Sequence, residues 1–474
     1  MTDNPAATAP LSVLFATAEF APIARVGGLA AAAAGLVSAL RADGLDVEVV
    51  LPDYSGTALT NEQPIDLDVP EWAAPAVARR GMLEGVGPIT LIHVPGIERS
   101  HPYLQPDGTG WHDNDERFMR FSAAVAALCS YARPDVLHLN DWHTAATLGF
   151  LYPRPATVLT VHTLGYQGRC DPGWVFALPH FREAFVQHGD VNPLAGGLRL
   201  ADAIIAVSPT YAHEITTAAG GFGLDDVLRD RGAALVGIRN GIDDVAWNPA
   251  IDPYLERTYD IDDVSGKAVE QVSIRAEFGL AATTGPLLVM VTRLVEQKGV
   301  DLVLDLVGDL ESLDAQLIVL GDGDTVLVDA LSAAAEQHPD RVVFRQGYDE
   351  RLAHRLTAAG DLLLMPSRFE PCGLAQMQAM RYGTLPVVTD VGGLHDTVID
   401  IDAHPEGGSG LVSSTVDVEG LRDAVRRGAA VVADDGRRTA AMRAGMTADW
   451  SWRKPAQEHV ELYRRVSTSR TTTR

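Results

Sequence analysis

A turn that carries an acid and a glycine follows a short apolar run in the C-terminal part of the chain. The run Leu362 to Met365 ends at Pro366, and Glu370 and Gly373 then precede an alanine- and methionine-rich segment with a helical pattern. This layout predicts backbone N–H groups and the positive end of a helix dipole beside a carboxylate, at the C-terminal edge of a parallel sheet. A ligand with both a phosphate and a polyhydroxylated ring, such as a sugar nucleotide, would suit it.

Two cations, Arg293 and Lys298, follow the apolar run LLVMV. In an acidic protein, paired cations at the end of a central strand are well placed to neutralise a departing diphosphate. A solvated loop with two surface charges is the alternative interpretation.

A glycine turn, Arg25-Val26-Gly27-Gly28-Leu29, lies shortly after the first strand-like run. Gly27 and Gly28 would let the backbone approach a ligand closely, and Arg25 adds a cation. An ordinary strand-to-helix turn explains the same residues equally well. A second such turn begins at Val391 and gives a weaker signal.

Histidines surround an aspartate in the segment HLNDWHT. His138 and His143 flank Asp141, and His162 ends the strand-like run TVLTVHT. They are unconvincing as metal ligands because no matching Asp-x-Asp or His-x-His set accompanies them. They could form a polar floor beneath a sugar, and ordinary packing is the alternative for His138 and His143.

The elements that must position these residues form two series of apolar strands separated by helix-length segments. The first series is LSVLFAT, DVEVVLP, ITLIHVP, DVLHLN, TVLTVHT and AIIAVS, and the second is LLVMVTR, LIVLGDG, VVFRQG, LLLMPS and TLPVVTD. Such alternation predicts an α/β fold of two doubly wound parallel sheets covered on both faces. The Asp-, Pro- and Gly-rich stretch between the series is expected to be a linker, with the ligand in the cleft between the domains.

Composition limits the possible partners. The chain has 474 residues, enough for two domains, and its 38 Lys and Arg against 63 Asp and Glu give a net charge of -25. This balance argues against nucleic acid or an anionic membrane as a general partner. The N-terminus reads as a first strand rather than a signal peptide, and the three cysteines show no metal-ligand spacing, so we expect a cytoplasmic protein. Cys372 is expected to be a packing thiol rather than a nucleophile.

Across nearly its whole length the chain resembles glycosyltransferase family 5, the bacterial glycogen synthases and plant starch synthases. The matching motifs, in order, are RVGGL, LPDYSG, DNDERF, HLNDWHTA, VHTLGYQG, AVSPTYAHEI, GFGLDDVL, IRNGIDDVAWNP, VTRLVEQKGVDLVL, GDGD, SRFEPCGLAQMQAMRYGTLPVV, VGGLHDTV and SWRKPAQEHVELY. The resemblance implies a GT-B enzyme of two Rossmann-like domains. It would transfer a glycosyl group from a nucleotide donor with retention of configuration, without an essential metal or other cofactor.

The resemblance also implies roles and boundaries. The catalytic residues would be His162, Arg293, Lys298 and Glu370. The donor-binding residues would be Arg25, Gly27, Gly28, Asp141, Asn240, Tyr348 (stacking on the base), Cys372, Gly373 and Leu374. The acceptor-binding residues would be Tyr103, Asp141, His162 and Thr163. The expected domains are 1–245 for the acceptor, a linker at 246–266, and 267–450 for the donor, followed at 451–474 by a helix that packs back and a disordered tail.

The chain departs from the family pattern at a few positions. Arg25 and Ala31 stand where the family has Lys and Asp in the first glycine turn, Thr163 replaces an Asn, and Ala195 replaces a Lys. Arg and Lys differ in hydration and geometry, and a lost hydrogen bond to a substrate can change discrimination by orders of magnitude. The leaving-group residues are intact.

Three hypotheses follow. The first is a retaining glycosyltransferase that extends an α-1,4-glucan or oligosaccharide from a nucleoside diphosphate glucose, with ADP-glucose preferred. The second is a pseudo-glycosyltransferase that couples a nucleotide-activated unsaturated cyclitol, such as a GDP derivative, to an amino sugar through a C–N bond. The third is a catalytically silent glucan-binding or regulatory protein, which would have no need for leaving-group cations. The base of the donor and the oligomeric state are left open.

Overall fold

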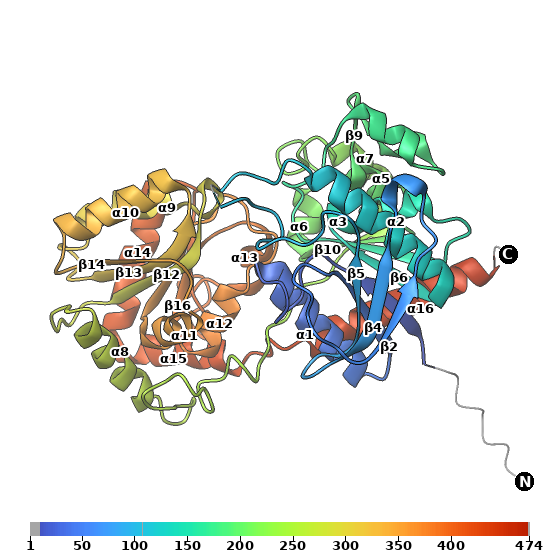
Figure 1. Ribbon diagram of the computed structural model, residues 1–474. Helices are drawn as coiled ribbons and strands as arrows, with labels where there is room; N and C mark the ends of the chain where they lie inside the picture. Colours follow the sequence, from blue (N-terminus) through green and yellow to red (C-terminus); the bar gives the residue numbers. More distant parts are fainter. Residues whose placement is uncertain (1–9, 107, 473–474) are drawn as a thin grey trace, which may run out of the picture. The chain divides into compact units, whose positions relative to one another are not determined.

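The computed structural model describes residues 10–106 and 108–472, which form two compact units (Figure 1). Of the described residues, those up to Gly241 and those from Trp452 onward form unit 1, and Ile242–Ser451 form unit 2. The chain therefore leaves unit 1, forms the whole of unit 2 and then returns.

Unit 1 is built on a nine-stranded sheet with the order β11-β10-β7-β6-β1-β2-β5-β4-β3. Its strands are β1 (Ser12–Ala16), β2 (Asp46–Pro52), β3 (Thr60–Asp66), β4 (Val77–Leu83), β5 (Gly87–His93), β6 (Val136–Asn140), β7 (Ala156–Val161), β10 (Ala203–Ala206) and β11 (Leu235–Gly237). Every strand predicted from an apolar run is present, and those strands pair in parallel. The prediction of wholly parallel sheets is wrong at one edge, where β4 pairs antiparallel with both β5 and β3.

Helices cover both faces of this sheet. They are α1 (Gly28–Ala42), α2 (Asn114–Ala132), α3 (Trp142–Ala145), α4 (Thr147–Phe150), α5 (Pro193–Leu200), α6 (Pro209–Glu214), α7 (Asp225–Arg231) and α16 (Arg453–Thr472). A small hairpin, β8 (Val186–Gln187) with β9 (Asp190–Val191), lies apart from the main sheet.

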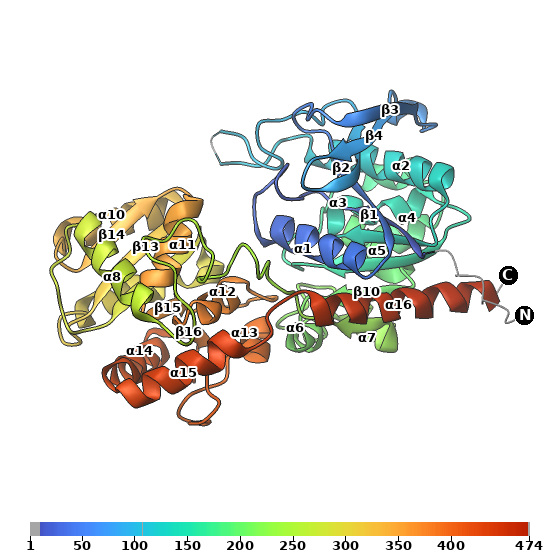
Figure 2. The same cartoon turned by 90° about the horizontal axis from the view of Figure 1, so that it is seen from below.

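The last helix, α16, belongs to the core of unit 1. It packs against α1 and β7 and runs along the unit in Figure 2. Trp452, Tyr463 and Val466 are buried in the same hydrophobic cluster as Phe15 and Leu36. The expectation of a disordered tail is wrong for residues 467–472, because the helix continues through them to Thr472. The final two residues of that expected tail lie outside the described part of the chain.

Unit 2 contains a parallel six-stranded sheet with the order β14-β13-β12-β15-β16-β17. Its strands are β12 (Leu287–Leu294), β13 (Gln316–Gly323), β14 (Val342–Gln346), β15 (Leu362–Met365), β16 (Leu385–Thr389) and β17 (Leu411–Ser413). Its helices are α8 (Ser265–Glu277), α9 (Val300–Leu306), α10 (Thr325–Gln337), α11 (Glu350–Ala359), α12 (Ala375–Arg381), α13 (Gly392–Thr397), α14 (Val418–Ala433) and α15 (Asp435–Thr447). The apolar faces of strands and helices share one buried core.

Residues 246–266, expected to be a linker, lie within unit 2. The segment lacks periodicity because it is held by individual contacts rather than by one regular element. Trp247 stacks on His354 with ring centroids 3.8 Å apart, and the buried Asp252 accepts hydrogen bonds from His354 Nδ1 at 2.8 Å and from the Tyr382 hydroxyl at 2.6 Å.

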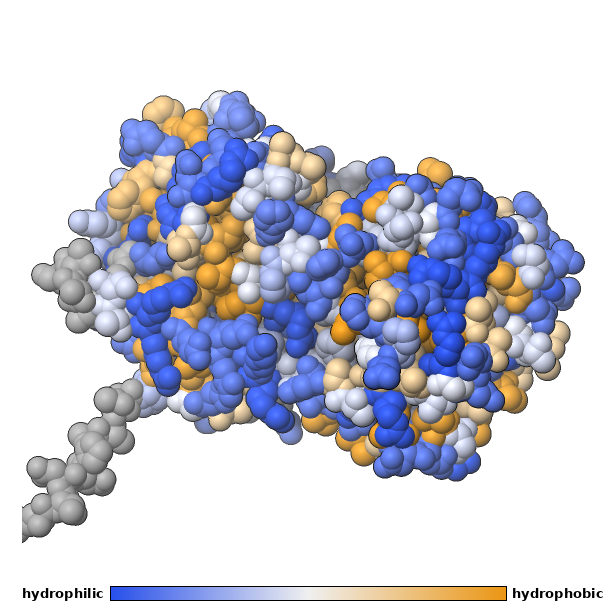
Figure 3. Space-filling view, turned by 180° about the vertical axis from the view of Figure 1, so that it is seen from behind, coloured by the Kyte–Doolittle hydropathy of each residue, from blue (hydrophilic) through white to orange (hydrophobic). Residues whose placement is uncertain are grey.

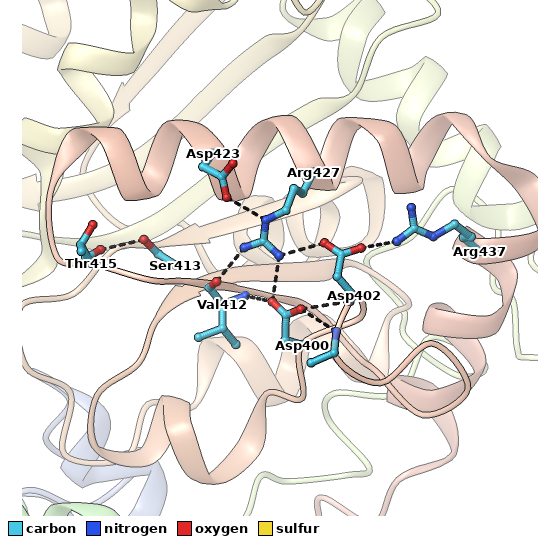
Figure 4. Close-up of polar contacts among 9 residues, drawn as sticks. Asp400, Asp402, Val412, Ser413, Thr415, Asp423, Arg427 and Arg437 are labelled. Carbon is cyan, nitrogen blue, oxygen red and sulfur yellow. Dashed lines mark hydrogen bonds and ion pairs between the residues drawn. The ribbon is translucent and has the colours of Figure 1, made fainter.

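An arginine-centred network holds the loop between α13 and β17 against the last helices of unit 2 (Figure 4). Arg427 of α14 pairs with Asp400 and Asp402 at 3.0 Å and with Asp423 at 2.9 Å, and its Nη2 donates to the Val412 carbonyl. Arg437 of α15 also binds Asp402. These pairs tie the loop to both helices.

The face drawn in Figure 3 shows mostly hydrophilic side chains with smaller hydrophobic areas between them. Among the residues described, no helix is both long and apolar enough to cross a membrane.

Candidate active site

Three loops meet at the C-terminal edge of the sheet in unit 2. They follow β12, β15 and β16, and backbone groups join them: Arg368 N donates to the Gln297 carbonyl at 2.8 Å, and Gly393 N donates to the Glu370 carbonyl at 3.0 Å. Gly299 and Gly393 allow this approach, because a Cβ on either would lie 2.2 Å from the carbonyl oxygen of Pro366 or Cys372, respectively. The residues predicted to bind the donor's diphosphate and sugar are therefore brought together.

Lys298 and Glu370 form an ion pair at this edge, with Nζ 2.5 Å from Oε2. The Ser367 hydroxyl donates to the same oxygen at 3.0 Å. The two side chains are only 17% and 7% exposed, so each charge depends on the other for compensation. A donor carrying phosphates and hydroxyl groups offers a replacement partner to both.

Arg293, at the end of β12, is exposed, and its guanidinium finds no hydrogen-bond or ion-pair partner among residues 10–106 and 108–472. It presents an uncompensated positive charge at the same sheet edge as Lys298. This pair of cations can attract and neutralise an anionic group.

The turn before α12 carries the other predicted donor contacts of unit 2. Gly373 has φ +72°, and Gln376 Nε2 donates to the carbonyls of Cys372 at 3.0 Å and Gly373 at 3.2 Å, which fixes the turn. Leu374 is the N-cap residue of α12. Cys372 is buried, as expected of a packing thiol. Tyr348 lies between β14 and α11 with 70% of its surface exposed, so its ring is accessible to a ligand.

In unit 1 the glycine turn is bound to a buried acid that the sequence analysis missed. Glu19 Oε2 accepts hydrogen bonds from the N–H groups of Val26 and Gly27, both at 2.9 Å, and Oε1 accepts one from the Tyr103 hydroxyl at 2.9 Å. The Gly27 N–H is therefore already committed to a protein group. Arg25 lies exposed at the start of this turn.

Asp141 lies at the end of β6 in a strained conformation. Its φ of 53° and ψ of -173° fall in a region that is essentially reserved for glycine. Its Oδ1 accepts hydrogen bonds from the backbone N–H groups of His162 at 2.7 Å and Thr163 at 3.5 Å. Burial raises the pKa of Asp141 to about 7, those two backbone bonds oppose the change, and nearby Glu19 adds to it.

His162 is held as a neutral imidazole at the end of β7. Its Nε2 lies 2.9 Å from Asn140 Oδ1, while Asn140 Nδ2 donates to the Ala16 carbonyl at 3.0 Å. This orientation of the Asn140 amide assigns the proton to His162 Nε2 and leaves Nδ1 with a lone pair. Burial, and secondarily His459, lower the pKa of His162 to about 3. The side chain can accept or relay a hydrogen bond at neutral pH without carrying charge.

The two histidines that flank Asp141 are packing residues. His138 is fully buried, with Nδ1 2.5 Å from the Tyr463 hydroxyl and Nε2 2.7 Å from Thr160 Oγ1. His143 is buried in an aromatic cluster and stacks on Tyr103, with ring centroids 4.9 Å apart. His143 thus supports a predicted acceptor residue, whereas His138 fixes α16 against the sheet.

Asn240 follows β11 and lines a small enclosed space of about 10 Å³ together with Asn140 and His162. The unit 1 candidates Asp141, His162 and Asn240 thus follow the carboxyl ends of β6, β7 and β11 in one sheet, at the edge where ligands of open α/β sheets bind. Among the described residues no cluster of three His, Cys, Asp or Glu side chains could hold a metal ion.

Two Rossmann-like units of this kind define the GT-B class of glycosyltransferase. Residues 12–230 match the starch synthase catalytic domain family, and residues 274–430 match the glycosyl transferases group 1 family. The chain belongs to the glycogen synthase and starch synthase family.

Relatives match the chain over almost all of its length. A glycogen synthase of Halorhodospira halophila is 43% identical, covering 97% of this chain and 100% of the relative. Glycogen synthase 1 of Methylococcus capsulatus is 41% identical, covering 96% of each chain. Among solved structures, the catalytic domain of starch synthase IV from Arabidopsis thaliana, bound to ADP and acarbose, superposes with a TM-score of 0.87 at 32% identity, covering 97% of this chain and 100% of that one.

Proposed function

We propose that the protein is a retaining, metal-independent glycosyltransferase that transfers glucose from a nucleoside diphosphate donor, preferably ADP-glucose, to the end of an α-1,4-glucan or oligosaccharide. The observation that carries the proposal is the sheet edge of unit 2, where Arg293, Lys298 and Glu370 lie in a chain that is over 40% identical to glycogen synthases. The preference for ADP draws support from the bound nucleotide named for the similar starch synthase.

The charges fit the demands of the reaction. As the bond between C1 of glucose and the β-phosphate oxygen breaks, positive charge develops on the sugar and negative charge on the diphosphate. Arg293 and Lys298 would stabilise the departing diphosphate, and Glu370 would accept hydrogen bonds from the sugar hydroxyls once Lys298 turns to the phosphate. The positive charge of two side chains is the reason that we propose no metal.

Retention follows from attack on the face that the leaving group vacates. The acceptor hydroxyl forms the new C1–O bond there, and its proton passes to the departing phosphate oxygen, so no protein base is needed. His162 suits such a site because its imidazole stays neutral and offers Nδ1 as a hydrogen-bond acceptor, while Thr163 and Tyr103 would contact the acceptor.

The cyclitol alternative gains no support from the relatives. Its motivation is the set of departures at Arg25, Ala31, Thr163 and Ala195, and of these Ala195 is buried in α5, where it is part of the packed interior. We therefore keep glucosyl transfer as the proposal.

A substrate screen tests the proposal. Purified protein is incubated with ADP-glucose, UDP-glucose or a GDP-linked cyclitol, each with a maltooligosaccharide or an amino-sugar acceptor, with and without EDTA. We expect ADP release and longer glucans with ADP-glucose, insensitivity to EDTA, and new linkages with α-anomeric NMR signals. Lys298→Ala should abolish turnover, whereas Lys454→Ala, at an exposed site on α16, should not. β-Linked product, dependence on a metal, or turnover of the cyclitol donor alone would refute it.

A further inference from the structure

Glu19 is the buried acid that joins two segments of unit 1 that are far apart in the sequence. Glu19 follows β1 in the sequence, and only 5% of its surface is exposed. One carboxylate oxygen binds the turn before α1 and the other binds Tyr103, with all three hydrogen bonds at 2.9 Å. Each oxygen thus serves a different segment.

The turn depends on this carboxylate because it has no local cap. Gly27 is the N-cap residue of α1 and offers no side chain, and the first turn of the helix contains no acid. Glu19 therefore satisfies N–H groups at the start of α1 and meets the positive end of the helix dipole, as an acidic capping residue would. Arg25 contributes an exposed side-chain cation to the same turn.

Tyr103 depends on the same carboxylate from the other side. Its ring stacks on His143, and its backbone N–H donates to His101 Nδ1 at 3.1 Å, so the ring plane is fixed by packing. Glu19 then sets the direction in which the hydroxyl donates its proton. A charge-assisted bond of this kind is stronger than a bond between neutral groups.

We propose that Glu19 is a positioning residue that couples donor binding at the Arg25 turn to acceptor binding at Tyr103. The proposal rests on the proposed function for the identity of the two ligands. A contact between an acceptor and the phenol would change the hydrogen bond that the hydroxyl donates to Glu19, the same carboxylate that holds the turn. Ordering of the turn by a donor would in the same way stabilise the bond from the hydroxyl. Each ligand should then bind better in the presence of the other.

A thermodynamic cycle tests the coupling. Binding of ADP and of maltopentaose is measured by calorimetry, each alone and with the other saturating, for wild type, Glu19→Ala, Glu19→Gln, Tyr103→Phe and the Glu19→Ala/Tyr103→Phe double variant. We expect Glu19→Ala to weaken both ligands about tenfold and to remove their mutual effect, since a bond to a charged group is typically worth a factor of this order. Tyr103→Phe should add nothing to Glu19→Ala.

Glu19→Gln should rescue part of the loss, because its amide oxygen can still accept from the turn. In turnover, the variants should raise KM for both substrates more than they lower kcat. The matched control is Glu48→Gln, which changes another buried carboxylate of unit 1, bound to Thr90 and Arg80, and should leave the mutual effect intact. If the fold-changes in dissociation constant of Glu19→Ala and Tyr103→Phe multiply in the double variant, the two residues act independently and the coupling is refuted.

Hydrogen exchange separates this inference from the proposed function. Tyr103→Phe does not touch the turn, yet it should accelerate exchange of the Val26 and Gly27 amides, whatever the ligand. Unchanged exchange there would refute the coupling even if glucan is made. A wild-type protein that binds neither ADP nor maltopentaose would refute the proposed function, and accelerated exchange in the variant would still support the positioning role.

Discussion

Asp141→Asn should make the protein more stable at pH 8 but not at pH 4. The substitution keeps the oxygen that accepts the His162 N–H and keeps the residue's shape, but it removes a carboxylate whose pKa burial raises to about 7. Relative to an ordinary value near 3.9, and at 1.36 kcal/mol per pKa unit, ionising this group in the folded protein costs about 4 kcal/mol.

The sign of the pH dependence follows from proton binding. Between about pH 4 and pH 7 the folded protein holds a proton on Asp141 that the unfolded chain releases, so the free energy of unfolding falls as the pH rises through this window and stays low above it. The free energy of unfolding of Asp141→Asn should not fall in this way, because the variant has no carboxyl group to ionise. At roughly 2–4 °C per kcal/mol, its unfolding temperature should exceed that of wild type by roughly 10 °C at pH 8.

Thermal unfolding of both proteins from pH 4 to pH 8.5 is the assay. Asp252→Asn is the control of opposite sign: burial raises the pKa of Asp252, but hydrogen bonds from His354 and Tyr382 outweigh it and lower the pKa overall, so that variant should lose stability at neutral pH. If the difference in unfolding temperature between Asp141→Asn and wild type does not change with pH, ionisation of the Asp141 carboxylate is not the cause of that difference.

Other variants probe the remaining features. Gly393→Ala would place a methyl group against a backbone carbonyl and should lower kcat at least tenfold, while Gly407→Ala, with open space around it, should match wild type in the same turnover assay. Glu370→Gln should tighten ADP binding in calorimetry by about tenfold, because Lys298 can bind a phosphate without first breaking an ion pair with a carboxylate. The variant should also impair transfer, and an unchanged ADP affinity would contradict the prediction. Lys267 has a pKa lowered by burial to about 7, so stability should rise from pH 7 to about pH 10 in wild type but not in Lys267→Gln, and parallel melting profiles would refute this.

The sequence was informative wherever a residue's role depends on its near neighbours. Apolar runs predicted most of the parallel strands, because a strand buried on both faces needs little else. The parallel strands β11 and β17 were not predicted, since each has only three residues. The edge strand β3 (TNEQPID) was missed because it is almost entirely exposed and carries no apolar pattern. Residues 246–266 were assigned to a linker because single contacts, such as Asp252 with His354, leave no periodic signal.

The candidate site divides in the same way. Lys298 and Glu370 were predicted as functional from strand ends and motifs. Their mutual ion pair could not be predicted, because the two residues are far apart in the sequence. Glu19 was missed because an acid after a strand is common, and its partner Tyr103 lies in a distant loop. The roles assigned to Tyr348, Gly373 and Leu374 stay predictions until a ligand is bound.

The return of the chain to unit 1 has a consequence for synthesis on the ribosome. The buried side chains of Trp452, Tyr463 and Val466 complete the core of unit 1, yet they are translated after all of unit 2. At 5–20 residues per second the nascent first unit must wait roughly 10–40 s with the apolar face of α1 uncovered. Unit 2 is continuous in the sequence and needs no residue that is translated after Ser451. A fragment that ends near Gly241 should therefore aggregate, whereas one in which α16 is grafted directly after it should be recoverable as a folded domain.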